Sequence, residues 1–205
     1  MPGRNTVKDY AAEHYYHIYN RGANKNVIFH EASDYKLFLY LLKRHLGIKP
    51  LLDKQQRPYR HLKDSVDLVS YCLMPNHFHL LVYNKEQNGI ELLMRSVTTT
   101  YSMYYNKKYQ HSGHVFQGIY KATLIESDTY LQHISRYIHR NPKNYMEYEY
   151  SSYKPLVKQY DVEWLSKKLL NDIFEGTIEE YEQFVADYED YKESLEEITL
   201  DLADH

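Results

Sequence analysis

Two histidines separated by one residue are the first feature of the sequence that could carry out chemistry. His77 and His79 flank Phe78 in a mostly apolar run, which predicts a strand over residues 77–83. Side chains alternate along a strand, so both imidazoles would lie on one face, about 7 Å apart, and could bind one ion. Phe78 would point into the core. The alternative is a pair of exposed or hydrogen-bonded histidines, since the chain contains 12.

A second set of polar groups lies on a predicted helix that begins after Ser127 and ends before Pro142. Tyr130, Tyr137 and Asn141 are seven and four residues apart, so they share one helical face. Spacing alone favours an amphipathic core helix with tyrosines at its edge. The chain has 24 tyrosines, so frequency does not identify a catalytic one.

The net charge of −3 conceals an asymmetry along the chain. Residues 1–174 carry +8, whereas residues 175–205 hold 12 acidic residues and one basic residue. A basic body with an acidic end is typical of a nucleic-acid-binding protein whose tail moderates its field, although a solvated acidic helix is the alternative. Four cations, two of them expected on an exposed side of the helix, either contact DNA phosphates or are solvated: Arg21, Lys121, Arg136 and Arg140.

The elements that must position these residues alternate in type along the chain. Apolar periodicity and turn residues predict four strands and three helices. The strands are expected at residues 15–19, 66–74, 77–83 and 119–125, and the helices at residues 33–46, 89–104 and 127–141. The order β-α-β-β-α-β predicts an α+β, ferredoxin-like sandwich with two helices on one face of one antiparallel sheet. The third helix is an addition to that fold.

The C-terminal part is less regular. Residues 162–174 and 178–202 are expected to be helical, and the second of these segments forms most of an acidic tail. The predicted organisation is therefore a domain over residues 1–155 and a helical acidic extension over residues 156–205.

Composition excludes several classes of protein. The single cysteine, Cys72, excludes an internal disulfide and fits a reducing compartment. No apolar run approaches the roughly 18 residues of a membrane span. The N-terminal segment is polar and lacks the apolar core of a signal peptide. A cytoplasmic protein without a membrane partner is expected.

Five short motifs together resemble one family, the IS200-like single-tyrosine (HUH) transposases. Residues 74–82 are similar to its histidine–hydrophobe–histidine signature, and residues 19–22 to its first-strand turn. Residues 113–118 resemble the segment before its last strand. Residues 137–142 and 151–153 resemble the helix and the following segment of the branch associated with repetitive extragenic palindromes (REP). The resemblance covers about residues 15–153.

The resemblance implies a DNA-cleaving and rejoining enzyme that acts on single-stranded or hairpin DNA. His77 and His79 would bind a divalent ion, Mg²⁺ or Mn²⁺, with Asn141 in the place of a third ligand, where the insertion-sequence branch has glutamine. Tyr137 would be the nucleophile and would form a 5′-phosphotyrosine, with Tyr130 as the reserve candidate. Relatives act as homodimers or as monomers.

Other functions remain open on the sequence. A non-catalytic nucleic-acid binder could use the same fold with exposed aromatic residues. A metal-dependent phosphodiesterase would use water in place of the tyrosine. An inactive relic of a transposon would keep the fold alone.

Overall fold

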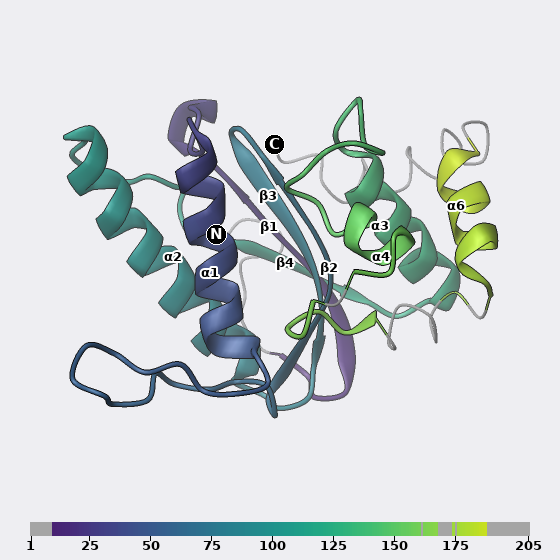
Figure 1. Ribbon diagram of the computed structural model, residues 1–205, viewed down its shortest axis with the longest axis horizontal. Coiled ribbons are helices and arrows are strands. Elements are labelled where there is room, and N and C mark those ends of the chain that lie inside the picture. The colour runs from purple at the N-terminus through teal and green to yellow at the C-terminus, as the bar shows by residue number, and fades with distance from the viewer. Residues whose placement is uncertain (1–9, 161, 168–173, 175, 188–205) are drawn as a thin grey trace, which may run out of the picture.

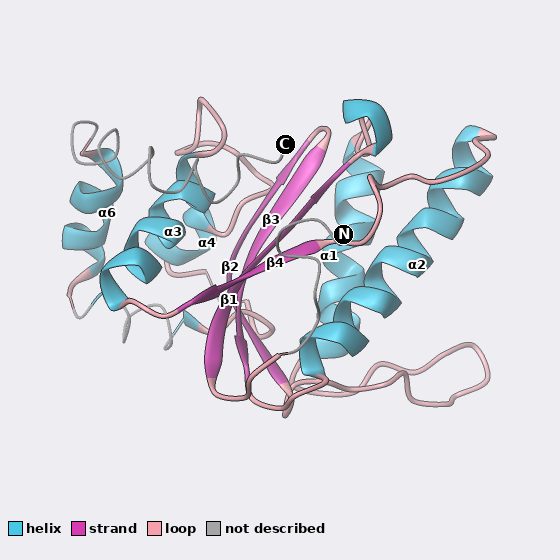
Figure 2. Ribbon diagram, turned by 180° about the vertical axis from the view of Figure 1, so that it is seen from behind, coloured by secondary structure: helices cyan, strands magenta, loops and turns pink. Residues whose placement is uncertain are grey.

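A single antiparallel sheet separates two layers of helices (Figures 1 and 2). The computed structural model describes residues 10–160, 162–167, 174 and 176–187. The sheet has the order β2-β3-β1-β4. Its strands are β1 (His14–Arg21), β2 (Val66–Met74), β3 (His77–Asn84) and β4 (Lys121–Ile125). Every neighbouring pair is antiparallel.

The two faces of the sheet carry different helices (Figure 1). One face is covered by α1 (Ala32–Leu46) and α2 (Gly89–Tyr109). The other face is covered by α3 (Asp128–Arg140), with α4 (Tyr153–Val157) and α6 (Ile178–Ala186) beside it. A short 3-10 helix, η1 (Ala23–Lys25), follows β1. The predicted α+β, ferredoxin-like architecture with an additional helix is confirmed.

Strand alternation produces two cores. Ile18 and Phe78 lie in the core shared with α1 and α2, whereas Tyr19 and Leu81 lie in the core beneath α3. Adjacent residues of one strand therefore serve opposite layers. This alternation decides which polar groups can meet α3.

The helix α2 is longer than predicted. It continues to Tyr109 through residues expected to form a loop, because Asp34 of α1 binds its last turn. The Lys108 ammonium lies 2.6 Å from Asp34 Oδ1, and the Tyr109 hydroxyl donates to Asp34 Oδ2 at 2.6 Å. The helix ends at Gln110, which is left-handed with φ of 50°.

The structure corrects part of the prediction for the C-terminal helices. The segment 162–166 is not helical: Leu165 forms a parallel bridge to Leu68, and Trp164 stacks on Tyr71. The helix expected at residues 178–202 is present as α6 and ends at Ala186. Residues 168–173 and 188–202 of the two predicted helices lie outside the described residues. Among the described helices, each is too short or too polar to span a membrane.

Candidate metal and tyrosine site

The two histidines of the His-x-His pattern share the face of the sheet beneath α3. In the register of β1 and β3, Arg21 pairs with His77 and Tyr19 pairs with His79. The predicted opposite orientation of Phe78 is confirmed, because its buried ring packs on Phe38 with centroids 5.1 Å apart. The strand thus anchors both imidazoles through an apolar residue between them.

Tyr137 on α3 lies directly across from this pair. Its ring is edge-on to the His79 ring, with centroids 5.2 Å apart and an interplanar angle of 81°. The helix begins at the predicted cap, where the Ser127 hydroxyl accepts from the Tyr130 amide at 3.4 Å. The capped helix therefore brings a phenol against His79, which the sequence pattern alone did not establish.

Asn141, the residue that caps the C-terminus of α3, lies beside His77. The distance from His77 Nε2 to Asn141 Oδ1 is 3.0 Å, and that from His77 Nδ1 to Asn76 Oδ1 is 2.7 Å. A neutral imidazole donates only one proton, so two amide oxygens cannot both be satisfied. Burial lowers the pKa of His77, which the contact to Asn141 opposes and the charge of Arg21 reinforces. The imidazolium form that would satisfy both oxygens is therefore disfavoured.

A cation between His77 Nε2 and Asn141 Oδ1 would resolve this conflict, as would rotation of one amide by half a turn. Two adjacent ligands of an octahedral ion with bonds of about 2.1 Å lie about 3.0 Å apart, which is the separation found here. Among the described residues, no group of three or more His, Cys, Asp or Glu side chains could hold a metal. His77, His79 and Asn141 are the side chains that could hold a divalent ion here, and a donor set with two nitrogens would favour Mn²⁺.

A third histidine, His17 of β1, belongs to this site and was missed in the sequence. Its Nε2 lies 2.9 Å from His79 Nδ1, and both side chains are buried. This contact orients the His79 ring, so that any metal bond of His79 would use Nε2. His17 precedes Tyr19 by two residues, so alternation placed it on the same face, but the pairing of β1 with β3 was needed to bring it to His79.

Two of the four predicted DNA-contacting cations lie on the face of the site. Arg21 follows Tyr19 by two residues, and its Nε donates to Gln117 Oε1 at 2.5 Å. Lys121 pairs with Tyr19 across β1 and β4 and is half-buried. Both side chains therefore lie on the same face of the sheet as His77 and His79.

Arg136 and Arg140 are placed differently from the prediction of an exposed side. Arg136 is 0% exposed; its Nη1 donates to the Phe184 carbonyl at 3.2 Å. Arg140 Nη1 donates to the carbonyls of Val185 and Ala186 at 2.8 and 3.0 Å. These carbonyls belong to the last turn of α6, the negative end of its dipole. The two arginines of α3 therefore bind the C-terminus of α6 and hold the two helices together.

Tyr130 lies in the first turn of α3, about 10 Å along the axis from Tyr137. It is half-buried and packs against the core beneath α3, which includes Leu131 and Ile125. Tyr137, rather than Tyr130, is the tyrosine that lies edge-on to His79.

His139 joins α3 to the C-terminal segments from inside the core. Its two ring nitrogens lie 2.7 Å from the Tyr181 hydroxyl and 2.7 Å from the Ser152 hydroxyl. Ser152 Oγ also accepts from the Tyr71 amide at 2.8 Å. Ser152, in the Ser-Ser-Tyr motif at residues 151–153, thus links α3 to β2 through His139 and the Tyr71 amide.

Because His139 is buried, we predict that the protein loses stability in acid. Burial lowers the pKa of His139 to about 3, so between that value and about 6.5 the unfolded chain binds a proton that the folded chain does not. The free energy of unfolding should therefore decrease as the pH falls below about 6.5, by up to about 2 kcal/mol at about pH 5. Urea denaturation at several pH values measures this.

The control for His139 is His139→Gln, which keeps polar groups in place but does not titrate. The pH dependence should be shallower in this variant. Equal slopes in both proteins would assign the effect to other groups, of which His77 and His45 also have lowered pKa values.

Comparison with known proteins agrees with this geometry. Residues 58–141 match the family model described as "Transposase IS200 like", a segment that contains both histidines, Tyr137 and Asn141. The resemblance to the IS200-like transposases is confirmed. The matched segment of this transposase-like chain runs from the loop before β2 to the end of α3.

Two solved structures are similar to this chain to different degrees. The REP-associated tyrosine transposase bound to a REP hairpin has a TM-score of 0.55 and 13% identity over 80% of this chain and 91% of that chain. A protein assigned as a transposase of Deinococcus radiodurans R1 has a TM-score of 0.40 and 17% identity over 67% of this chain and 95% of that chain. No curated protein matches the sequence. At 13% identity, the likeness to the REP-associated transposase shows the fold alone.

Proposed function

We propose that the protein is a metal-dependent transposase that cuts and rejoins single-stranded or hairpin DNA through a 5′-phosphotyrosine at Tyr137. One observation carries the proposal: the Tyr137 ring lies against His79, while Asn141 of the same helix faces His77. A nucleophile and a donor set for an ion therefore meet at one end of the sheet. The match of residues 58–141 to a transposase family and the hairpin bound to the REP-associated transposase support this choice of reaction and substrate.

The chain's own groups can carry the reaction. A divalent cation, Mg²⁺ or Mn²⁺, held by His77, His79 and Asn141, would polarise the scissile phosphate and stabilise the departing 3′ oxygen. The Tyr137 oxygen would attack phosphorus as the bond to the 3′ oxygen breaks; the phenolic proton would pass to solvent, and the departing 3′ oxygen would take up a proton from solvent to become a hydroxyl. Arg21 and Lys121 are placed to hold phosphates of the bound strand. A 3′-hydroxyl can reverse the step and join strands without an external energy source.

A single chain supplies every group of this site. His77, His79, Tyr137 and Asn141 meet within one molecule, so a second chain is not required to complete it. We therefore propose that Tyr137 acts in cis, and a homodimer would serve another purpose than completing the site.

Cleavage and rejoining of end-labelled hairpin DNAs in Mg²⁺ or Mn²⁺ tests the function. We expect both shortened strands and longer recombinant strands, and loss of both with chelator. Shortened strands alone would indicate a phosphodiesterase that uses water. Binding without either product, over a broad pool of hairpins, would indicate a nucleic-acid binder or a relic.

A further inference from the structure

A two-stranded arm projects from one end of the helical layer formed by α1 and α2 (Figures 1 and 2). It consists of residues 48–61, within the connection between α1 and β2. That connection, residues 47–65, is longer than the roughly 12–15 residues above which a connection without its own helix or strand is usually functional or disordered. Residues 48–57 also precede the segment that matches the transposase family model. None of the arm residues takes part in the proposed reaction.

Hydrogen bonds within the arm give it a fixed shape. Leu52 and Pro58 form an antiparallel bridge. Beyond the bridge, the Asp53 amide donates to the Arg57 carbonyl at 2.8 Å, and the Arg57 amide donates to Asp53 Oδ1 at 2.9 Å. Gln56, between them, has φ of 61°, which closes the turn. The arm is thus an ordered ribbon, held by contacts that do not depend on the core.

The base of the arm is attached to α1 and to the core. The Arg44 guanidinium of α1 lies 4.5 Å from the centroid of the Tyr59 ring. His45 Nδ1 donates to the Arg60 carbonyl at 2.7 Å, and Leu62, just beyond the arm, is buried. Most side chains between residues 48 and 60 are exposed. The arm is therefore held firmly at its base, while the rest of it adds little to the core.

The cations of the arm outnumber its anions. Arg57 forms an ion pair with Asp53 at 2.8 Å. Lys49, Lys54 and Arg60 are exposed, and no acidic group in the described part of the chain pairs with them. A ribbon with three such cations presents a positive field to solvent, which attracts a polyanion.

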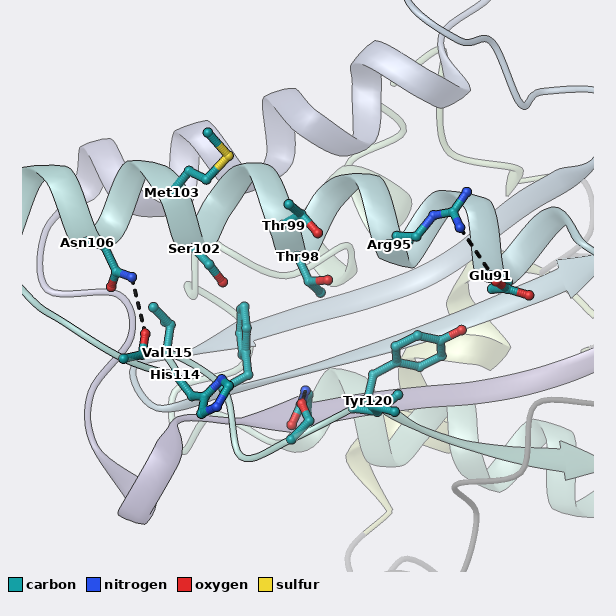
Figure 3. A pocket seen from close by; sticks show the side chains of 15 residues that line it. Glu91, Arg95, Thr98, Thr99, Ser102, Met103, Asn106, His114, Val115 and Tyr120 are labelled. Carbon is teal, nitrogen blue, oxygen red and sulfur yellow. Dashed lines mark hydrogen bonds and ion pairs between the residues drawn. The ribbon is translucent and has the colours of Figure 1, made fainter. Parts of the chain in front are cut away.

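The groove between α2 and residues 113–120 offers no comparable charge (Figure 3). Among the residues that line it, Arg95 lies 3.9 Å from the Glu91 carboxylate, and the Asn106 amide donates to the Gly113 carbonyl at 3.2 Å. These groups are already paired within the chain. Of the two surfaces, the arm is the one that offers unpaired cations.

We propose that the arm binds the phosphate backbone of double-stranded DNA outside the cleavage site, an inference that takes its choice of DNA from the proposed function. Two-stranded ribbons fit the grooves of DNA, and Lys and Arg side chains neutralise its phosphates. The exposed tip carries Gln55 and Gln56 rather than an aromatic ring, whereas sites for unpaired strands depend on rings that stack on bases. The Tyr59 ring lies at the base of the arm, where it covers Arg44. The arm therefore suits a duplex better than a single strand.

The length of the sheet separates the arm from the proposed active site. Val66, where the chain returns from the arm into the sheet, pairs with Asn84, whereas Met74 pairs with His77. The span of β3 from His77 to Asn84 is about 23 Å, or about seven base pairs of a duplex. Duplex DNA at the arm is therefore distinct from the strand that Tyr137 would cut.

Removal of the three unpaired charges tests the proposal. In Lys49→Gln/Lys54→Gln/Arg60→Gln, affinity for a blunt duplex of about 20 base pairs should fall at least about tenfold at low salt. The slope of log affinity against log salt should fall by about two to three. Fluorescence anisotropy over a salt series measures both quantities. The matched control removes three exposed charges outside the arm, in Lys36→Gln/Lys107→Gln/Lys158→Gln.

A crosslink from the tip of the arm locates the duplex directly. Gln55→Cys supplies an accessible thiol, because the natural cysteine, Cys72, is buried. A benzophenone group attached to this thiol should crosslink to the duplex, and to an equally long single strand much more weakly. The same crosslinking should decline when the three arm charges are removed.

The two proposals fail separately in these experiments. Duplex affinity and salt slope that do not change in the arm variant, or crosslinks to single strands alone, would overturn the assignment of the arm. Cleavage of a hairpin with a stem of about four base pairs should be the same in the wild type and the arm variant, since such a stem is shorter than the sheet. Absence of hairpin cleavage in both, with duplex binding still dependent on the arm, would contradict the proposed function alone.

Discussion

Tyr137→Phe is expected to reduce strand cleavage by about 10³-fold or more, because it removes the attacking oxygen and leaves the ring in place. The ring packs edge-on to His79, so its packing and the fold should persist. Initial rates of cleavage of an end-labelled hairpin in excess enzyme measure the effect. DNA affinity, measured in parallel, should change little, because the phenyl ring still fills its place against the histidine.

Tyr130→Phe is the matched control for this variant. Tyr130 lies on the same helix and packs against the core, so the loss of its hydroxyl should leave at least half of the activity. Similar losses in both variants would point to a general disturbance of α3. Full activity of Tyr137→Phe together with an inactive Tyr130→Phe would transfer the nucleophile to Tyr130.

The second large effect is expected from His77→Ala. This change removes the nitrogen that faces Asn141 Oδ1 at 3.0 Å and thereby one of three ligands in the proposed site. Affinity for Mn²⁺ should fall by about 100-fold or more, since even the loss of a residue that only supports a ligand commonly costs about 10–100-fold. Isothermal titration calorimetry with Mn²⁺ alone measures this without DNA. Cleavage should decline in the same variant.

His14→Ala is the control for metal binding. His14 is exposed at the start of β1, and its Nδ1 contacts the Ala12 carbonyl at 2.7 Å. If His77→Ala bound Mn²⁺ as tightly as the wild type, the contact between His77 and Asn141 would be a hydrogen bond only. That result would favour the interpretation of hydrogen-bonded histidines over a metal pair.

The sequence predicted the fold because its signals are local. Alternation around Phe78 placed His77 and His79 on one face, and Ser127 and Pro142 bounded the third helix. These features depend on strand pleating, a cap and proline geometry, which act within a few residues. The placement of the helix across from the histidines came from the family resemblance, since spacing alone favoured a core helix.

Features that depend on distant contacts were missed. His17 reaches His79 only through the register of β1 with β3. Arg136 was expected on an exposed side, because its partner α6 lies 48 residues away in the sequence. The last turn of α2 is likewise bound by Asp34 of α1. Periodicity within one segment carries no information about such partners.

The dependence of α3 on α6 also bears on the predicted boundary near residue 155. Tyr181 and Val185 of α6 are buried beneath α3, and Trp164 packs on Tyr71 of β2. Segments of the predicted extension thus complete the core around α3. The boundary between a catalytic domain and an extension remains a prediction.

The most direct test of the central claim is the mass of a protein–DNA adduct. The protein is incubated with Mn²⁺ and the hairpins it cleaves, denatured, digested with nuclease and protease, and analysed by mass spectrometry. We expect a 5′-phosphonucleotide linked to the peptide that contains Tyr137, with no such species in Tyr137→Phe or in the presence of chelator. Cleaved DNA with no adduct, or an adduct on another residue, would contradict the assignment of Tyr137 as the nucleophile.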